Sequence, residues 1–333
     1  MRTNVMLSMA AVTLIAGSAQ AQKARLNPLV ELLSQNKPAF GIYAPANPRA
    51  GRGGRGGAPA ADVASAPTPP PAKTPQQLAA DAVAYKGADY IFDGTMEGNF
   101  DAGYARFVDF MKGMDEGGAV DKKTGRQHHT LAVKTHEIAE NVPLAQERIG
   151  KQLNLGVGTI VFVGVESADE VKAGFAAMRF KSKGGVRPDD VGGAPAFWGL
   201  SEKDYKEKAD LWPLNPNGEL VNFTIVESKA GLAKLDEIAA VKGIGVLFPG
   251  AGTLRGVFTD TTGGQRKFDA EAWEASIQQV LAACKKYKVA CGYPANNTTE
   301  MEARLKQGFS VFISGWGDAG FQAIEAGKKA SGR

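Results

Sequence analysis

The sequence has few cysteines, few histidines and no long apolar run beyond its N-terminus. Only Cys284 and Cys291 are cysteine among 333 residues, and only three residues are histidine. A disulfide-rich scaffold is therefore excluded, and a hydrophobic fraction of 44% is enough for one sizeable core. No stretch after residue 21 reaches the length of a membrane-spanning helix, so we expect no membrane association after N-terminal processing.

The chain also has no region with a large excess of one charge. Its formal net charge is +4. The segment 46–77, with Arg49, Arg52, Arg55 and Lys73 against Asp62, supplies three of these charges, and Arg2 supplies the fourth. The remainder is neutral, which argues against a nucleic-acid-binding face.

The two cysteines fall in neighbouring predicted elements. Cys284 is late in a predicted helix, and Cys291 is inside the next predicted strand. Helix and sheet layers lie about 10 Å apart, whereas bridged cysteines need Cα atoms closer than about 7 Å. We therefore expect two buried thiols rather than a disulfide. A pair of metal-binding sulfurs is the least favoured of the three alternatives.

The first 21 residues have the layout of a secretory signal peptide. A basic Arg2 precedes an apolar stretch, and Ala19-Gln20-Ala21 forms a small-x-small site before Gln22. We expect cleavage after Ala21 and a soluble periplasmic or secreted protein, with an uncleaved anchor as the alternative. Residues 22–333 are expected to form a single domain.

The segment 47–75 is rich in Gly, Ala and Pro and lacks the apolar spacing needed for packing. It predicts a flexible insertion between the first strand and the first helix. We favour a tolerated insertion without a role in the site over a mobile, Arg-bearing lid.

Strand-like and helix-like segments alternate along the chain after residue 25. Eight short apolar segments predict strands, at 39–44, 88–94, 129–135, 159–165, 219–227, 243–250, 288–294 and 309–315. Amphipathic segments that follow them predict helices. Strands that are apolar on both faces suit a covered parallel sheet. The pattern predicts a (β/α)8 TIM barrel, with an amphipathic N-terminal helix within 27–37 capping its floor.

Polar side chains gather just after these strands, where barrel active sites lie. Glu227 is the lone acid ending the apolar run 219–227, and a buried carboxylate there needs a metal or substrate as partner. His136 and Glu166 are possible further metal ligands, although a surface histidine is the more ordinary interpretation. Gly250 and Gly252 of the turn 248–253 would let backbone N–H groups converge on a carboxylate.

At these residues the chain resembles the HpcH/HpaI aldolase and citrate lyase family, in its 4-hydroxy-2-oxoheptanedioate aldolase-like branch. The resemblance begins near Asn27, is interrupted by the 47–75 insertion, and rests on "ADYIFDGTMEGNFD", "GVGTIVFVGVESADEV", "LVNFTIVES", "GIGVLFPGAGTL" and "KVACGYPANNTTEMEARLKQGFSVFISG". It implies a (β/α)8 fold, a homo-oligomer that exchanges its last helix, and a divalent metal, Mg or Mn, that holds a 2-oxo acid as its enolate.

The resemblance is partial at the key positions. Glu227 matches the family's metal-binding glutamate, and Asp93-Gly94 matches the pair before its catalytic histidine. Met96 replaces that histidine, Lys134 replaces an arginine that polarises the 2-oxo group, and Gly252 replaces the second metal ligand. Lysine keeps the charge but not the bidentate geometry, and methionine cannot move protons.

Three interpretations follow. The first is a divergent carbon–carbon lyase acting on a small 2-oxo acid or related carboxylate, with Glu227 on the metal, Lys134 as electrophile, His136 or Glu97 as acid or base, and Gly250, Ala251 and Gly252 contacting substrate. The second is a catalytically silent barrel that binds a small acid. The third is a hydrolase or dehydratase on the same scaffold.

Overall fold

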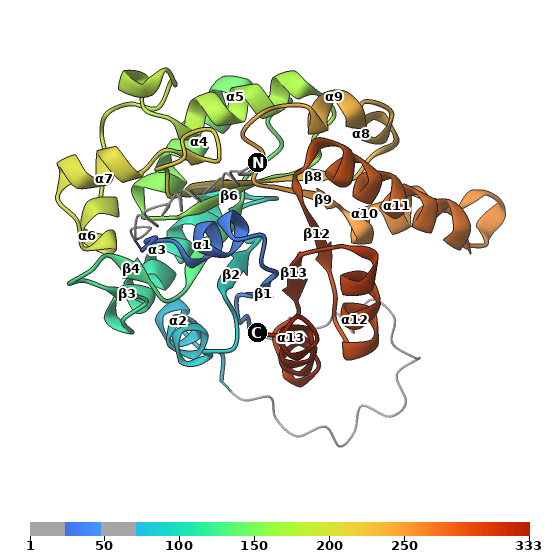
Figure 1. Cartoon of the computed structure of the whole chain (residues 1–333), viewed down its shortest axis with the longest axis horizontal. Coiled ribbons are helices and arrows are strands. Elements are labelled where there is room, and N and C mark those ends of the chain that lie inside the picture. Colours follow the sequence, from blue (N-terminus) through green and yellow to red (C-terminus); the bar gives the residue numbers. More distant parts are fainter. Residues whose placement is uncertain (1–23, 48–70) are drawn as a thin grey trace, which may run out of the picture.

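Eight parallel strands close into a barrel in this computed structural model (Figure 1). In chain order they are β1 (Ala39–Tyr43), β2 (Tyr90–Asp93), β5 (Thr130–Lys134), β6 (Thr159–Phe162), β8 (Leu220–Val226), β9 (Val246–Pro249), β12 (Ala290–Pro294) and β13 (Val311–Ser314). Each pairs in parallel with the next, and β13 pairs with β1 to close the ring. The predicted (β/α)8 TIM barrel is confirmed, and each predicted strand segment contains one barrel strand.

The structure describes residues 24–47 and 71–333. The predicted signal peptide, with its cleavage site, lies outside the described residues, as does most of the predicted 47–75 insertion. The described ends of that insertion meet at the C-terminal side of β1. There the Asn47 side chain donates to the Lys73 carbonyl at 2.7 Å and accepts from the Lys73 N–H at 2.8 Å.

Helices cover the outside of the barrel (Figure 1). The main ones are α2 (Pro75–Ala84), α3 (Phe100–Glu116), α4 (Val142–Asn154), α5 (Ala168–Met178), α8 (Lys229–Ala233), α9 (Leu235–Ala239), α11 (Ala270–Tyr287), α12 (Thr298–Gln307) and α13 (Asp318–Ala330). Short polar side chains cap most of their first turns, as Asn141 does for α4 and Asp269 for α11. The segment 229–240 divides at Lys234 into two short helices, α8 and α9.

Shorter elements fill the connections. Between β6 and β8 lie α6 (Ala194–Trp198), α7 (Glu202–Lys208) and the two-residue strand β7 (Leu211–Trp212), which pairs with β8 outside the ring. β3 (Val120–Asp121) and β4 (Arg126–Gln127) form one small hairpin. α10 (Ala251–Val257) precedes a second hairpin, β10 (Thr259–Asp260) and β11 (Lys267–Phe268).

Side chains alternate between the barrel interior and the helical layer, as the pleat requires. The interior cluster includes Tyr90, Phe92, Phe223, Phe248 and Ile313. Two strand glycines make room for its rings. A Cβ at Gly41 would lie 2.2 Å from the Tyr90 ring, and one at Gly292 would lie 2.1 Å from the Phe248 ring. The interior is therefore a packed core rather than a pore.

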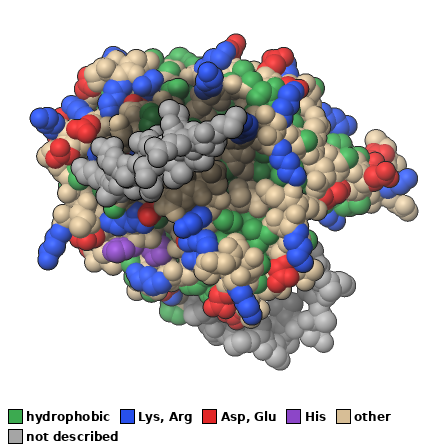
Figure 2. All heavy atoms as spheres, viewed as in Figure 1, with side chains coloured by type: hydrophobic (Ala, Val, Ile, Leu, Met, Phe, Trp, Pro, Cys, Tyr) green, Lys and Arg blue, Asp and Glu red, His purple; other side chains and the backbone are tan. Residues whose placement is uncertain are grey.

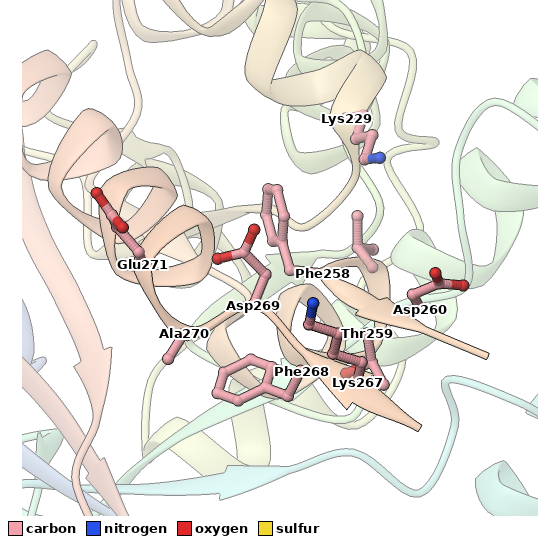
Figure 3. A pocket seen from close by; sticks show the side chains of 10 residues that line it. Lys229, Phe258, Thr259, Asp260, Lys267, Phe268, Asp269, Ala270 and Glu271 are labelled. Carbon is pink, nitrogen blue, oxygen red and sulfur yellow. The ribbon is translucent and has the colours of Figure 1, made fainter. Parts of the chain in front are cut away.

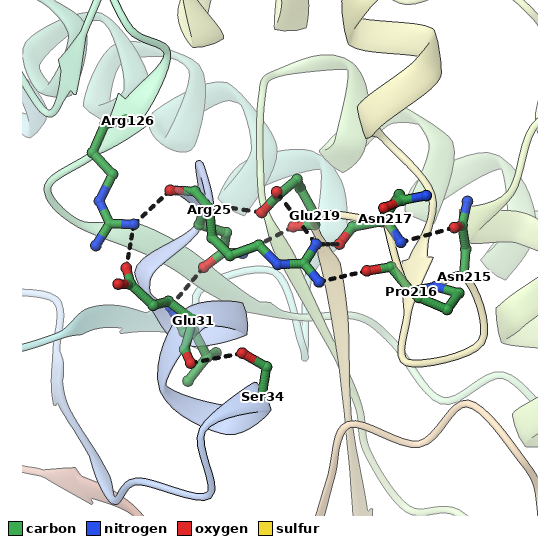
Figure 4. A network of polar contacts seen from close by, with 11 residues as sticks. Arg25, Glu31, Ser34, Arg126, Asn215, Pro216, Asn217 and Glu219 are labelled. Atoms are coloured by element: carbon green, nitrogen blue, oxygen red, sulfur yellow. Dashed lines mark hydrogen bonds and ion pairs between the residues drawn. The ribbon is translucent and has the colours of Figure 1, made fainter. Parts of the chain in front are cut away.

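The N-terminal helix α1 (Pro28–Ser34) closes the barrel floor, as predicted. Leu29, Val30 and Leu33 are buried against the interior cluster. Figure 4 shows the polar contacts around it, centred on Glu219, which lies directly before β8. Glu219 Oε2 accepts from the Asn27 N–H at 3.1 Å, and Arg25 lies 3.6 Å from Glu219 Oε1. Burial raises the pKa of Glu219.

The structure corrects the prediction of two free thiols, because Cys284 and Cys291 form a disulfide with Cα atoms 5.6 Å apart. The spacing between helix and sheet layers does not apply at this point. Lys288 takes a left-handed conformation and ends α11, and the chain turns at once into β12. The end of the helix and the start of the strand therefore lie side by side. Both cysteines are buried.

Within residues 24–47 and 71–333, no helix combines the length and apolarity needed to cross a membrane. Figure 2 shows Lys and Arg side chains interspersed with Asp and Glu over the visible face, without a large patch of one sign.

Candidate functional site

Three polar side chains point inward where strands end at the C-terminal mouth of the barrel. The alternation of inward residues places Tyr43 after Gly41 on β1, Lys134 after Ala132 on β5, and Glu227 after Ile225 on β8. The same register puts Gly94, Gly250 and Gly315 at the mouth after Phe92, Phe248 and Ile313. Three positions at the mouth are therefore glycine.

Glu227 is held by backbone on both sides. Its Oε1 accepts a hydrogen bond from the Gly164 N–H at 3.0 Å. A Cβ at Gly250 would lie 2.3 Å from the Glu227 Cβ and 2.5 Å from its Oε2, so this close packing requires glycine. The residue is half-buried, and no Lys, Arg or His of the described ranges forms an ion pair with it.

Lys134, Glu97 and His136 come together at the mouth. Lys134 Nζ donates to both oxygens of Glu97 at 2.9 Å. His136 Nδ1 contacts the Glu97 carbonyl oxygen at 2.8 Å, and its Nε2 contacts Glu140 at 2.5 Å. The hydrogen bond to the Glu97 carbonyl, aided by Glu140, raises the pKa of His136 and favours the imidazolium. Lys134 is therefore ion-paired rather than free.

Tyr43 belongs to this group and was missed by the sequence analysis. Its ring packs edge-on against Phe92 with centroids 5.0 Å apart. Burial of the hydroxyl raises the pKa of Tyr43; Lys134 opposes this, and Glu97 and Glu227 add to it. The inward alternation from Gly41 could have identified it, but a tyrosine ending an apolar strand gives no chemical signal in the sequence.

Among the described residues, the mouth has more acidic than basic groups. The Glu137 side chain lies over Gly164, whose added Cβ would come 2.7 Å from Glu137 Oε1. Partial burial and the neighbouring Glu140, Glu227 and Glu166 raise the pKa of Glu137. Lys134 and His136 thus face several carboxylates, and an anionic substrate would need further positive charge.

The donor set tests whether a metal fits. Among the described residues, no group of three or more His, Cys, Asp and Glu side chains is arranged to hold a metal ion. His136 and Glu166 are therefore not assembled with Glu227 as ligands. Glu166 instead accepts from the Ser228 hydroxyl at 2.5 Å. Mg usually binds one or two carboxylates plus substrate and water oxygens, so Glu227 fits as a single protein ligand only.

The predicted substrate contacts at Gly250, Ala251 and Gly252 change in one respect. The Gly250 N–H donates to the Val226 carbonyl at 2.9 Å, so it is not turned toward a ligand as predicted. The Gly250 N–H makes this bond because the hydrogen-bonded pairing of β8 with β9 continues past the ends of the two strands. Ala251 and Gly252 start α10, which has no side-chain cap, and a Cβ at Gly252 would meet no atom within 4 Å.

Asp93 and Met96 point away from the mouth. Asp93 follows the inward Phe92, so its side chain faces the helical layer, where it is 6% exposed. Met96 is fully buried in the outer core, and Gln152 Nε2 contacts its sulfur at 3.8 Å. A histidine in place of Met96 would therefore be buried among the helices, which argues against restoring aldolase chemistry by that change.

A separate cavity of about 780 Å³ lies beside α10 and the β10–β11 hairpin (Figure 3). Its walls include Lys229, Phe258, Lys267 and Asp269. Asp260 lies on this hairpin, where it is exposed and accepts from the Thr262 N–H at 2.8 Å. Asp260 is not among the residues brought to Glu227.

The barrel, with Glu227 and Lys134 at the ends of two strands that flank β6, defines a (β/α)8 protein with a polar mouth. Residues 127–326 match the sequence model of the HpcH/HpaI aldolase/citrate lyase family. The chain belongs to that family, and the resemblance found in its motifs is confirmed.

Three relatives show the extent of the similarity. A hydroxypyruvate/pyruvate aldolase of Paraburkholderia phytofirmans is 26% identical over 172 residues, which span 50% of this chain and 62% of that relative's length. A family protein from Burkholderia cenocepacia superposes with TM-score 0.59 and 19% identity over 87% of this chain and 92% of its own. An HpcH/HpaI aldolase from Desulfitobacterium hafniense gives TM-score 0.57 and 15% identity over 88% and 91%. At these identities, the two structures show a shared fold.

Proposed function

We propose that the protein is a carbon–carbon lyase acting on a small 2-oxo acid or related carboxylate, with a divalent metal, Mg or Mn, held in part by Glu227. The observation that carries this proposal is the charge imbalance at the barrel mouth. Glu227 is fixed by Gly164 and Gly250 without a cationic partner in the described ranges. A metal at Glu227 would supply the positive charge that an anionic substrate requires at this acidic mouth.

Each residue has a role in this scheme. Glu227 would hold the metal, which, when bound, stabilises negative charge that develops on the substrate oxygen. Lys134 would leave Glu97 and donate to the substrate oxo group or carboxylate. The released Glu97 would then accept a proton, and His136 or Tyr43 would supply one. Ala251 and Gly252 would contact the substrate carboxylate through their N–H groups.

The direct test is turnover with defined substrates. We expect purified protein with Mn or Mg to cleave or form 4-hydroxy-2-oxo acids, with pyruvate or hydroxypyruvate as one component. Product analysis by mass spectrometry distinguishes this reaction from hydrolysis or dehydration. Without turnover of any acid on a panel that varies chain length and hydroxylation, the proposal fails.

The alternative is a silent barrel that binds a small acid, and one observation favours it. Met96 is packed into the outer core, and Lys134 is paired through both Glu97 oxygens. The mouth thus lacks a histidine from that position and holds its cation in an ion pair. Binding of pyruvate without any product would support this alternative.

We predict a pH dependence that arises from His136. Because its pKa is raised above the ordinary 6.5, the imidazolium is populated below that raised value and lost as pH rises through it. If His136 is the acid, kcat/KM should fall as the pH rises through this raised pKa. His136→Gln should remove this fall from the pH profile. His128→Gln, at an exposed position, is the matched control. An unchanged profile in His136→Gln would assign the acid elsewhere.

We further propose that the mature protein begins at Gln22 and lies in the periplasm or outside the cell. The Cys284–Cys291 disulfide supports this, because such bonds persist mainly in oxidising compartments. Mass spectrometry of the exported protein should show a chain starting at Gln22. An intact Met1 in a membrane fraction would contradict the proposal.

Reduction of that disulfide should have a modest effect on stability. The sequence separation is only 7 residues, and so short a loop contributes about 2 kcal/mol in the chain-entropy account. We expect a reductant, or the double change Cys284→Ser and Cys291→Ser, to lower Tm by a few degrees. Unchanged Tm after reduction confirmed by mass spectrometry would contradict this prediction.

We also propose a homo-oligomer. In the single chain, α13 packs on β1 and β13 of its own barrel. Light scattering on purified protein would give the subunit number, and exchange of the last helix requires α13 to leave this position.

A further inference from the structure

A small cavity lies among the helices at the C-terminal ends of β1 and β2, on the outward side of Asp93. It has a volume of about 360 Å³ and lies between the loop after β1, α2 and α3. Leu78, Phe107 and Phe110 form apolar walls, and the rings of the two phenylalanines stack with centroids 6.0 Å apart. The Asn47–Lys73 hydrogen bonds hold one edge in place. This cavity is large enough for a small organic molecule.

Asp93 lines this cavity and is 6% exposed. Its Oδ1 accepts from the Thr95 N–H at 2.9 Å and from the Thr95 hydroxyl at 2.6 Å. Within the described ranges, no donor contacts Oδ2 and no cation pairs with the carboxyl group. Burial raises the pKa of Asp93. A carboxyl group in an apolar wall without a cation is unfavourable, so a ligand that brings an ammonium group would be favoured there.

Arg106 lines the same cavity from α3 and is exposed. Among residues 24–47 and 71–333, no carboxylate forms an ion pair with it. Lys73, the other cation of the lining, is already paired with Asp81 at 2.5 Å. Arg106 therefore offers a guanidinium that can take a carboxylate from a ligand.

We propose that this cavity binds an α-amino acid with a large apolar side chain. The ammonium group meets Asp93, the carboxylate meets Arg106, and the side chain packs against Phe107 and Phe110. A simple amine would leave Arg106 facing a second positive charge, and a simple acid would leave Asp93 without a cation. The ligand class thus follows from the two opposite charges and the aromatic wall, and it is independent of the reaction proposed at the mouth.

Calorimetry on the whole protein tests the assignment with three probes. L-phenylalanine carries both charges, 3-phenylpropionate lacks the ammonium group, and phenethylamine lacks the carboxylate. We expect L-phenylalanine to bind with Kd below about 1 mM, and each analogue to bind about tenfold more weakly or not at all. Absent binding of L-phenylalanine, or equal binding of 3-phenylpropionate, would overturn the proposal.

Two variants locate the binding. Asp93→Asn keeps an oxygen for the Thr95 hydrogen bonds and removes the charge, so L-phenylalanine should bind at least about tenfold more weakly. Arg106→Gln, at an exposed position, should weaken the binding of L-phenylalanine and should not weaken that of phenethylamine. Lys112→Gln, exposed on the same helix, is the matched control. If Asp93→Asn does not fold, Arg106→Gln decides alone: unchanged affinity for L-phenylalanine refutes the site.

Discussion

Glu227→Gln should abolish both lyase turnover and Mn binding while leaving the barrel folded. Glutamine keeps the shape and can still accept from the Gly164 N–H, but it removes the negative charge that holds a divalent ion. We expect kcat/KM to fall about 10³-fold or more, because the charge stabilisation supplied by a metal is worth several kcal/mol. The measurements are turnover and titration calorimetry with Mn.

The exposed Glu166→Gln is the control at this face, since Glu166 contacts Ser228 and is not assembled as a ligand with Glu227. Equal Mn affinity in wild type and Glu227→Gln would rule out a metal at Glu227. Absence of Mn binding in both proteins would favour the silent barrel. Gly252→Asp gives the opposite test, because an added Cβ there meets no atom within 4 Å. A second carboxylate should strengthen Mn binding, and only while Glu227 is present.

Lys134→Gln should have the second largest effect. Lys134 is the only lysine in direct contact with Glu97 in the described ranges. In the proposed scheme it donates to the substrate oxo group at the mouth. Its loss should lower kcat/KM by about 10²- to 10³-fold, the cost of removing one donor to developing negative charge. Steady-state kinetics would separate the loss in kcat from any rise in KM.

Lys134→Arg keeps the charge and provides two parallel donors, so it should retain far more activity than Lys134→Gln. Lys151, which is ion-paired with Glu147 on α4, provides the control Lys151→Gln. If Lys134→Gln and Lys134→Arg lose activity equally, the side chain acts as a nucleophile rather than as a positive charge, and borohydride trapping with a 2-oxo acid would detect the Schiff base.

The sequence by itself determined the barrel and the places where its strands end. Both follow from local patterns: apolar segments predict strands, amphipathic segments predict helices, and a parallel barrel puts every strand end at one face. Glu227, Lys134 and His136 could be placed at that face because alternation along a strand is a short-range property. The family resemblance in the motifs added the chemistry that such a mouth supports.

Only the tertiary structure decided which side chains meet. Glu97 and Lys134 are 37 residues apart, and their ion pair arises because β2 and β5 are neighbours in the ring. The Tyr43 side chain points into the mouth, whereas those of Asp93 and Met96 point toward the helices. The closed barrel fixes these directions. Cys284 and Cys291 pair because α11 ends directly beside the start of β12. Such contacts depend on packing between elements, and spacing along the chain does not determine that packing.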